Sequence, residues 1–368
     1  MYKARIGLLL ILTLTWLLTA CQPVGAPAAQ PAESAAAAEA PLTKVKVQLA
    51  WVKQGEFHGI FNAIEQGFYR EAGLEVEVLA GGPDVRGVQI VASGAAEFGI
   101  GAPSVVIASR ANGVPLKMVA QSFQDSFTVY IAKKARGYET IEDIKGAKFG
   151  VWFGGGEYEP QLMAEKAGVG AADVNWVAQK FSMTEFYEDQ LDVASATLHN
   201  ELHVVLGDGY KREDLTIFRA SDFGAAMVAD GIYTTEEMIS SKPEIVQAFL
   251  DATMRGWKWG LQNGNEAAEI VLKFSPELDL QKQVYQVEEV NKLITARAAQ
   301  EHGLGYMDPQ DWAVSQEALL ALKAIDAPID LAAAYDASFW EKIPEAYTTL
   351  ADLDMAAINE RIAKNLGE

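Results

Sequence analysis

Residues 45–79 read VKVQLAWVKQGEFHGIFNAIEQGFYREAGLEVEVL, and this stretch decides the fold. An alternating apolar and polar pattern at its start predicts a strand, a helical pattern follows over residues 60–69, and a second alternating strand follows over residues 74–78. These elements form one βαβ unit. Its first loop leaves the carboxyl end of a strand, which is where open α/β sheets bind ligands.

That first loop carries Trp51, Gln54, Phe57 and His58 in place of glycines. It therefore offers flat rings and not a phosphate cradle, and neither GxGxxG nor GxxxxGK[ST] occurs in the chain. We interpret the loop as one wall of a pocket for an aromatic solute. For His58 the alternative is a hydrogen-bonded structural residue.

The roughly 327 residues after position 41 exceed one ordinary core and suit two α/β domains. Strand and helix patterns alternate throughout. The segments 127–133 and 218–233 predict the two crossings between domains, and a long helix begins at Lys242-Pro243. We expect a first lobe made of residues 44–128 and 232–368 and a second lobe of residues 129–231. Within the second lobe, the short apolar runs 193–197 and 202–206 both suggest strands.

Other loops that follow strands supply further candidates for ligand contact. Asp84 follows two glycines and either accepts a hydrogen bond or caps the next helix, and Ser104 is a plausible helix N-cap. A second-lobe loop carries three glycines between aromatic residues, and a later one carries an amide that could pair with a heterocycle edge. The candidates in these two loops are Trp152, Glu157, Tyr158 and Asn200.

The strand, Trp and polar loop, followed by F-x-G-I-F and G-F-Y-R-E-A-G-L-E-V, resemble the NMT1/THI5-like (SsuA/THI5) family of solute-binding lipoproteins of ABC transporters. The resemblance implies a periplasmic-binding-protein type II fold, with two lobes of mixed sheet flanked by helices and joined by two crossover strands. It also implies solute capture by hinge closure and delivery to an ABC permease and its ATPase.

Within the family, V-x-Q-x-x-F-H-G, Gly-Gly-Pro-Asp and Trp-Phe-Gly-Gly-Gly-Glu-Tyr look most similar to riboflavin receptors. A receptor for a thiamine-precursor pyrimidine is the alternative. A remote alternative is enzymatic, because fungal THI5-like members make the thiamine pyrimidine. Their cysteine-rich iron motif has no counterpart here, where the single cysteine is Cys21. We expect no catalytic residue, no cofactor and no metal site.

The start of the chain predicts export. Residues 1–20 have a basic beginning and a short apolar run, which is typical of a signal peptide, and Cys21 after small residues resembles a lipobox. We expect a lipidated, palmitate-bearing Cys21, with residues 21–43 as a disordered tether; the alternative is an ordinary signal peptide with an incidental cysteine.

The expected location is the outer face of the cell membrane, reached through the lipid anchor only. Without residues 1–20 the chain has 28 basic and 50 acidic residues, a net charge of about −22, which argues against nucleic acid as a partner. We expect a monomer that binds a small planar heterocycle.

Overall fold

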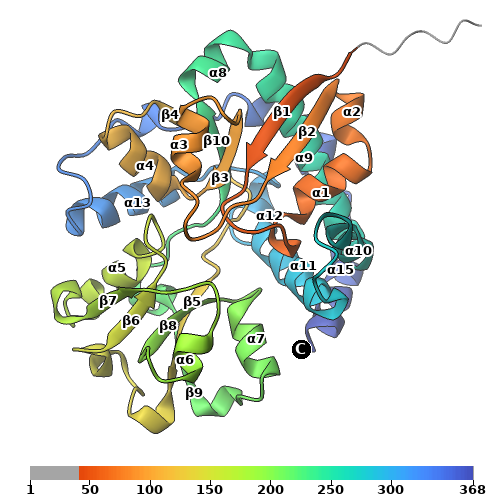
Figure 1. The fold of residues 1–368 in the computed structure, drawn as a ribbon. Coiled ribbons are helices and arrows are strands. Elements are labelled where there is room, and N and C mark those ends of the chain that lie inside the picture. The colour runs from red at the N-terminus through yellow and green to blue at the C-terminus, as the bar shows by residue number, and fades with distance from the viewer. Residues whose placement is uncertain (1–40, 368) are drawn as a thin grey trace, which may run out of the picture. The chain divides into compact units, whose positions relative to one another are not determined.

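The computed structural model describes residues 41–367. The predicted signal peptide, Cys21 and nearly all of the predicted tether lie outside the described residues. Two five-stranded sheets organise the described part (Figure 1). We name the lobe built on the first sheet the first lobe and the lobe built on the second sheet the second lobe.

The first sheet has the strand order β2-β1-β3-β10-β4. β1 is parallel to both of its neighbours, whereas β10 is antiparallel to β3 and β4. The βαβ unit predicted from residues 45–79 is therefore at one side of this sheet. The strands are β1 (Thr43–Gln48), β2 (Leu74–Leu79), β3 (Phe98–Gly101), β4 (Leu116–Ala120) and β10 (Gly231–Thr235).

The second sheet has the order β7-β6-β8-β5-β9, and here β5 is the strand antiparallel to its neighbours. The chain enters this sheet at β5 and returns to the first sheet at β10. In each sheet, then, the antiparallel strand is the one that arrives from the other lobe. The strands are β5 (Thr128–Lys133), β6 (Lys148–Val151), β7 (Asn175–Ala178), β8 (Val193–Thr197) and β9 (Leu215–Phe218).

Helices flank both sheets, so the predicted two-lobed α/β architecture is confirmed. The second lobe contains α5 (Tyr158–Lys166), α6 (Thr184–Tyr187) and α7 (Glu201–Gly207). The other helices are α1 (His58–Glu65), α2 (Phe68–Glu71), α3 (Gly87–Ala92), α4 (Pro103–Ala111), α8 (Glu236–Ser241), α9 (Pro243–Gln262), α10 (Gly264–Phe274), α11 (Leu280–Ile294), α12 (Ala299–His302), α13 (Pro309–Ala321), α14 (Glu345–Thr348) and α15 (Met355–Leu366).

The core of the first lobe is centred on α9, which begins at Pro243 as predicted. Its apolar stripe is buried, including Phe249 and Trp257. α9 crosses α1 closely because both helices carry glycine there: a Cβ on Gly256 would lie 2.0 Å from the carbonyl oxygen of Gly59. This contact holds the start of α1, and hence the loop after β1, against the core.

The prediction of a strand over residues 202–206 is wrong, because this run forms most of α7. Glu201 explains the start of the helix: its Oε2 accepts hydrogen bonds from the backbone N–H and the hydroxyl of Thr197, at 2.9 and 2.7 Å. These bonds turn the chain directly after β8. A run of five residues, four of them apolar, cannot by itself distinguish a strand from a short helix.

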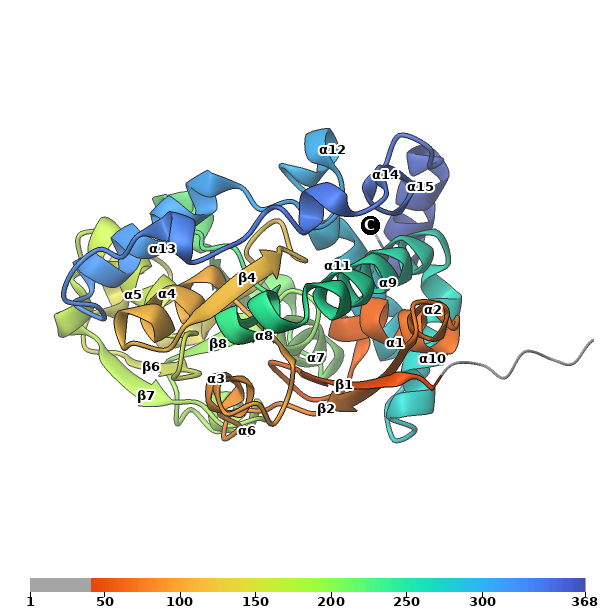
Figure 2. The same ribbon diagram turned by 90° about the horizontal axis from the view of Figure 1, so that it is seen from above.

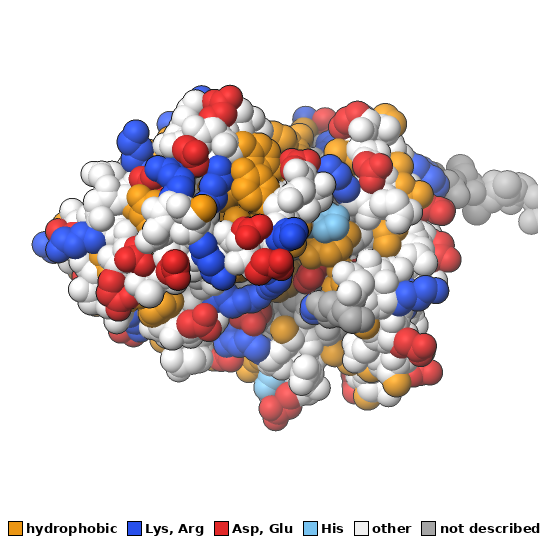
Figure 3. All heavy atoms as spheres, turned by 90° about the horizontal axis from the view of Figure 1, so that it is seen from below, with side chains coloured by type: hydrophobic (Ala, Val, Ile, Leu, Met, Phe, Trp, Pro, Cys, Tyr) orange, Lys and Arg blue, Asp and Glu red, His pale blue; other side chains and the backbone are white. Residues whose placement is uncertain are grey.

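Helix α13 contacts both lobes, since Ala318 packs into the second-lobe core and Trp312 and Leu319 pack into a cluster of the first (Figure 2). Asp308 caps this helix as predicted, accepting from the Gln310 N–H. In the part of the chain that the structure describes, no helix combines the length and apolar character needed to cross a membrane. On the face shown in Figure 3, acidic and basic side chains are interspersed, so the negative charge is not gathered there in one patch.

Candidate functional site

A cavity of about 890 Å³ lies between the two lobes. Its walls come mainly from loops that follow the carboxyl ends of β1, β2 and β3 in the first lobe and of β6 and β8 in the second. These are the sheet edges where α/β proteins bind ligands, and the volume falls in the range typical of small-molecule sites.

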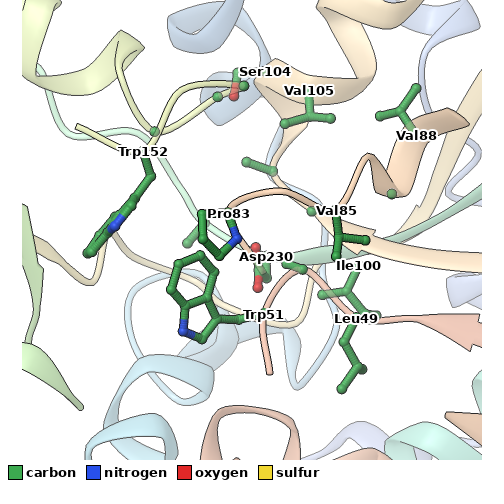
Figure 4. Close-up of a pocket in the computed structure, with 18 of the residues that line it drawn as sticks. Leu49, Trp51, Pro83, Val85, Val88, Ile100, Ser104, Val105, Trp152 and Asp230 are labelled. Atoms are coloured by element: carbon green, nitrogen blue, oxygen red, sulfur yellow. The ribbon is translucent and has the colours of Figure 1, made fainter. Parts of the chain in front are cut away.

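Aromatic rings from the two lobes meet across this cavity. The rings of Trp51 and Trp152 have centroids 5.6 Å apart at an interplanar angle of 58°, and Trp51 stacks on Phe181 at 5.6 Å and 11°. Figure 4 shows Trp51 beside Pro83, with Trp152 projecting from the opposite lobe. The sequence reasoning missed Phe181, although its position three residues after β7 (Asn175–Ala178) was an available signal.

Seven of the ten predicted ligand residues line the cavity: Trp51, Gln54, Asp84, Ser104, Trp152, Tyr158 and Asn200. Asp84 is not the N-cap of the helix after it, since α3 begins after Arg86. Ser104 is also not an N-cap: Ala102 holds that position, and Pro103 occupies the first turn. Both corrections shift a helix start by two residues, which local sequence preferences do not resolve.

Phe57 and His58 do not line the cavity, because the 3-10 turn Gly55–Phe57 directs them into the first-lobe core. His58 is fully buried, with its ring 4.7 Å from that of Trp257 and its Nδ1 3.1 Å from Asn62 Nδ2. Burial, followed by the charge of Arg361, lowers the pKa of His58 to about 3. This histidine is therefore neutral and packed between α1 and α9.

Glu157 also lies outside the cavity lining. Its Oε2 accepts hydrogen bonds from the N–H groups of Gly154 and Gly155, at 3.0 and 2.7 Å. Both glycines have positive φ angles, 108° and 145°, which explains why the loop needs glycine. The carboxylate thus shapes the loop that carries Trp152.

An acidic cluster that the sequence reasoning did not select lines the inner part of the cavity. It consists of Glu56, Asp230, Glu201 and the neighbouring His199, all at most 7% exposed. His199 Nε2 lies 3.7 Å from Glu56 Oε2, and Gln54 Nε2 donates to the same oxygen at 2.8 Å. Asp230 interrupts the apolar run of residues 225–232, and an acid in such a run was the available signal.

Burial dominates the electrostatics of this cluster. It raises the pKa of Glu56 to about 7, with the nearby charge of Glu201 adding to the rise, and it raises the pKa of Asp230 well above its ordinary value, helped by Glu56. Burial lowers the pKa of His199 to about 4. Within residues 41–367, no group of three or more His, Cys, Asp or Glu side chains is arranged to hold a metal ion.

Comparison with known proteins places this site in a family. The model of the family described as NMT1/THI5 like matches residues 54–267, and the chain belongs to this family. The riboflavin-binding protein RibY of Chloroflexus aurantiacus is 29% identical over 364 residues, covering 92% of this chain and 98% of RibY. The formylaminopyrimidine-binding protein of Halalkalibacterium halodurans is 24% identical, covering 74% of this chain and 83% of that protein.

Enzymes also occur among the relatives. A 4-amino-5-hydroxymethyl-2-methylpyrimidine phosphate synthase of Legionella pneumophila is 25% identical, covering 64% of this chain and 75% of the enzyme. Among solved structures, the periplasmic aliphatic sulphonate binding protein SsuA of Escherichia coli has a TM-score of 0.61 at 12% identity, covering 79% of this chain and 91% of SsuA. The fold is therefore that of periplasmic solute-binding proteins.

Proposed function

We propose that this protein is the extracytoplasmic solute-binding component of an ABC importer and that its solute is riboflavin. The observation that carries the proposal is the contact between rings of the two lobes, with Trp51 of the first lobe against Trp152 and Phe181 of the second. Trp51 and Trp152 also line the cavity, so their rings are available to a flat ring system bound there. Each aromatic contact contributes about 0.5–1.5 kcal/mol beyond the burial of area.

The mechanism that we propose is closure of the two lobes about segments 121–127 and 219–230, which connect the sheets. A solute that touches both lobes binds the closed form more tightly than the open one, and this difference in affinity drives closure. A permease and its ATPase would then recognise the closed form. In this scheme, residues 44–128 with 232–368 move as one lobe and residues 129–231 as the other, with lipidated Cys21 as the anchor.

Riboflavin is favoured over a single pyrimidine ring by two observations. The cavity of about 890 Å³ is large for a pyrimidine, and the match to RibY extends over nearly the whole of both chains. The alternative, a thiamine-precursor pyrimidine, is supported by the shorter match to the formylaminopyrimidine-binding protein. We propose binding without catalysis, because both of these relatives are binding proteins and the chain has no cysteine after Cys21.

Fluorescence titration tests this proposal. Purified protein should quench riboflavin emission with an end point at one solute per chain. Trp51→Ala should weaken binding by about tenfold or more, because it removes the ring shared by both inter-lobe contacts. Trp259→Phe is the matched control, since Trp259 packs against the first-lobe core and does not line the cavity. Absence of quenching together with tight pyrimidine binding would overturn the choice of solute.

A further inference from the structure

Glu56 and Asp230 both line the cavity and are at most 7% exposed, and Glu56 contributes to the raised pKa of Asp230, which indicates that the two buried carboxyl groups are neighbours. Two carboxyl groups can form a hydrogen bond only when a proton lies between them. Glu56 already accepts from Gln54, so Asp230 is the better-placed donor of the pair. One oxygen of Asp230 then carries the proton that is donated to Glu56, and the other oxygen is available to accept a hydrogen bond from a different group.

Within residues 41–367, at least one oxygen of Asp230 has no hydrogen-bond donor. Asp230 is 7% exposed, and its Oδ2 is buried without a hydrogen-bond partner in residues 41–367. His199 Nδ1 and Trp152 Nε1 are likewise buried without a partner there, and both residues line the same cavity. Buried polar groups are normally satisfied, so three such atoms around one cavity indicate that a bound molecule completes them.

We propose that Asp230, paired with Glu56, accepts a hydrogen bond from a ring N–H of the solute and so selects neutral heterocycles that carry this donor. The inference rests on the proposed function, and it adds the residue and the chemical group that set specificity. An anionic group at this position would face Glu56 and Glu201, which disfavours sulfonates and carboxylates.

The cavity around Asp230 also has apolar walls. Trp51, Pro83, Leu49 and Ile100 line the same cavity as Asp230 (Figure 4). These walls suit the faces of a ring system, while Asp230 can bond its edge. The imide N–H of a flavin requires only one acceptor.

The same arrangement makes solute binding depend on pH. The ionisable groups that face the pair are Glu201, His199, Glu289 and Tyr233, and Arg86 also lines the cavity. Because burial raises the pKa of Asp230, the pair holds its proton to higher pH than an ordinary carboxyl group and loses it as the pH rises further. Affinity should be constant on the acid side and then fall by up to about tenfold per pH unit once the proton is lost.

The decisive experiment measures riboflavin affinity from pH 6 to pH 9 for the wild type, Asp230→Asn and Asp230→Ala. An Asn amide donates to Glu56 and accepts from the solute, so Asp230→Asn should stay within about threefold of the wild type at pH 6 and lose the alkaline fall, whereas Asp230→Ala should bind about tenfold or more weakly. The matched control is Asp251→Asn. Burial also raises the pKa of Asp251, but this residue lies on α9 and does not line the cavity. The riboflavin affinity of Asp251→Asn, and the dependence of that affinity on pH, should equal those of the wild type.

A second comparison assigns the contact to the ring. Methylation of riboflavin at the imide nitrogen should weaken binding to the wild type much more than binding to Asp230→Ala, because the alanine variant has already lost the acceptor. Equal weakening in both proteins would overturn the inference. So would an Asp230→Asn variant as weak as Asp230→Ala.

Failure of the proposed function is distinguishable from failure of this inference. If the wild type does not bind riboflavin, the proposed solute is wrong, and the same variants are then titrated with 4-amino-5-hydroxymethyl-2-methylpyrimidine. An infrared measurement needs no solute: the difference spectrum of the wild type minus Asp230→Asn at pH 7 should contain a protonated carboxyl band, because the contribution of Glu159 is common to both proteins and cancels. Absence of the band from the difference spectrum would overturn the acid pair.

Discussion

Two buried carboxyl groups beside the cleft, Asp230 and Glu159, differ in how the protein satisfies them. Glu159, on α5 of the second lobe, accepts from Tyr130 Oη through Oε2 and from the Met227 N–H through Oε1, both at 2.8 Å. Asp230, next to β10 of the first sheet, has an oxygen, Oδ2, that is buried without a hydrogen-bond partner in residues 41–367. A carboxyl group with both oxygens bonded by the protein stabilises the fold, whereas one left incomplete at a cavity is available to a ligand.

The comparison predicts opposite effects on stability, and these are the largest effects that we expect. Glu159→Ala leaves the Tyr130 hydroxyl and the Met227 N–H buried without an acceptor, so the free energy of unfolding should fall by about 3–4 kcal/mol. Asp230→Ala removes a group that is poorly satisfied, and it should change the free energy by less than about 1 kcal/mol. Urea denaturation of both variants measures this. Equal destabilisation would show that the two carboxyl groups have the same role.

A smaller effect concerns pH. Burial raises the pKa of Glu159 in the folded protein to about 7, so the folded state holds this proton more tightly than the unfolded state. The resulting stability is complete below the ordinary value near 4.5 and is lost as pH rises through 7.

Glu159→Gln has no such proton to lose. Its free energy of unfolding relative to the wild type should therefore shift in its own favour between pH 4.5 and pH 8, by on the order of 2–3 kcal/mol. Denaturation curves at both pH values provide the measurement, and a difference independent of pH would contradict the assignment.

The smallest effect isolates one of the two bonds to Glu159. Tyr130→Phe removes the hydroxyl that donates to this carboxyl group and keeps the buried ring, so the free energy of unfolding should fall by about 1–2 kcal/mol. Thermal unfolding measures it. Tyr69→Phe is a matched control in the first lobe, because its hydroxyl bonds Thr253 and no carboxylate, and it should have a smaller effect. A larger effect at Tyr69 would contradict a special role for the Glu159 bond.

Local pattern predicted the elements well where a long periodic signal or a proline was present. The βαβ unit of residues 45–79, the start of α9 at Pro243 and the cap at Asp308 are all confirmed. It failed for residues 202–206, where a short apolar run forms α7 and where the deciding contact, Glu201 with Thr197, is made by a side chain.

The sequence by itself predicted loops that line the cavity, because Trp51 and Trp152 follow strands and loops after strands are where α/β sheets bind ligands. Only the tertiary structure decided which residues meet there. In the folded protein His58 is buried in the first-lobe core and contacts Trp257, and Glu157 bonds the loop that carries Trp152. Glu56 and Asp230, which are 174 positions apart in the chain, become neighbours. The physical reason is that proximity and burial, which set hydrogen bonding and pKa, are produced by packing between segments far apart in sequence.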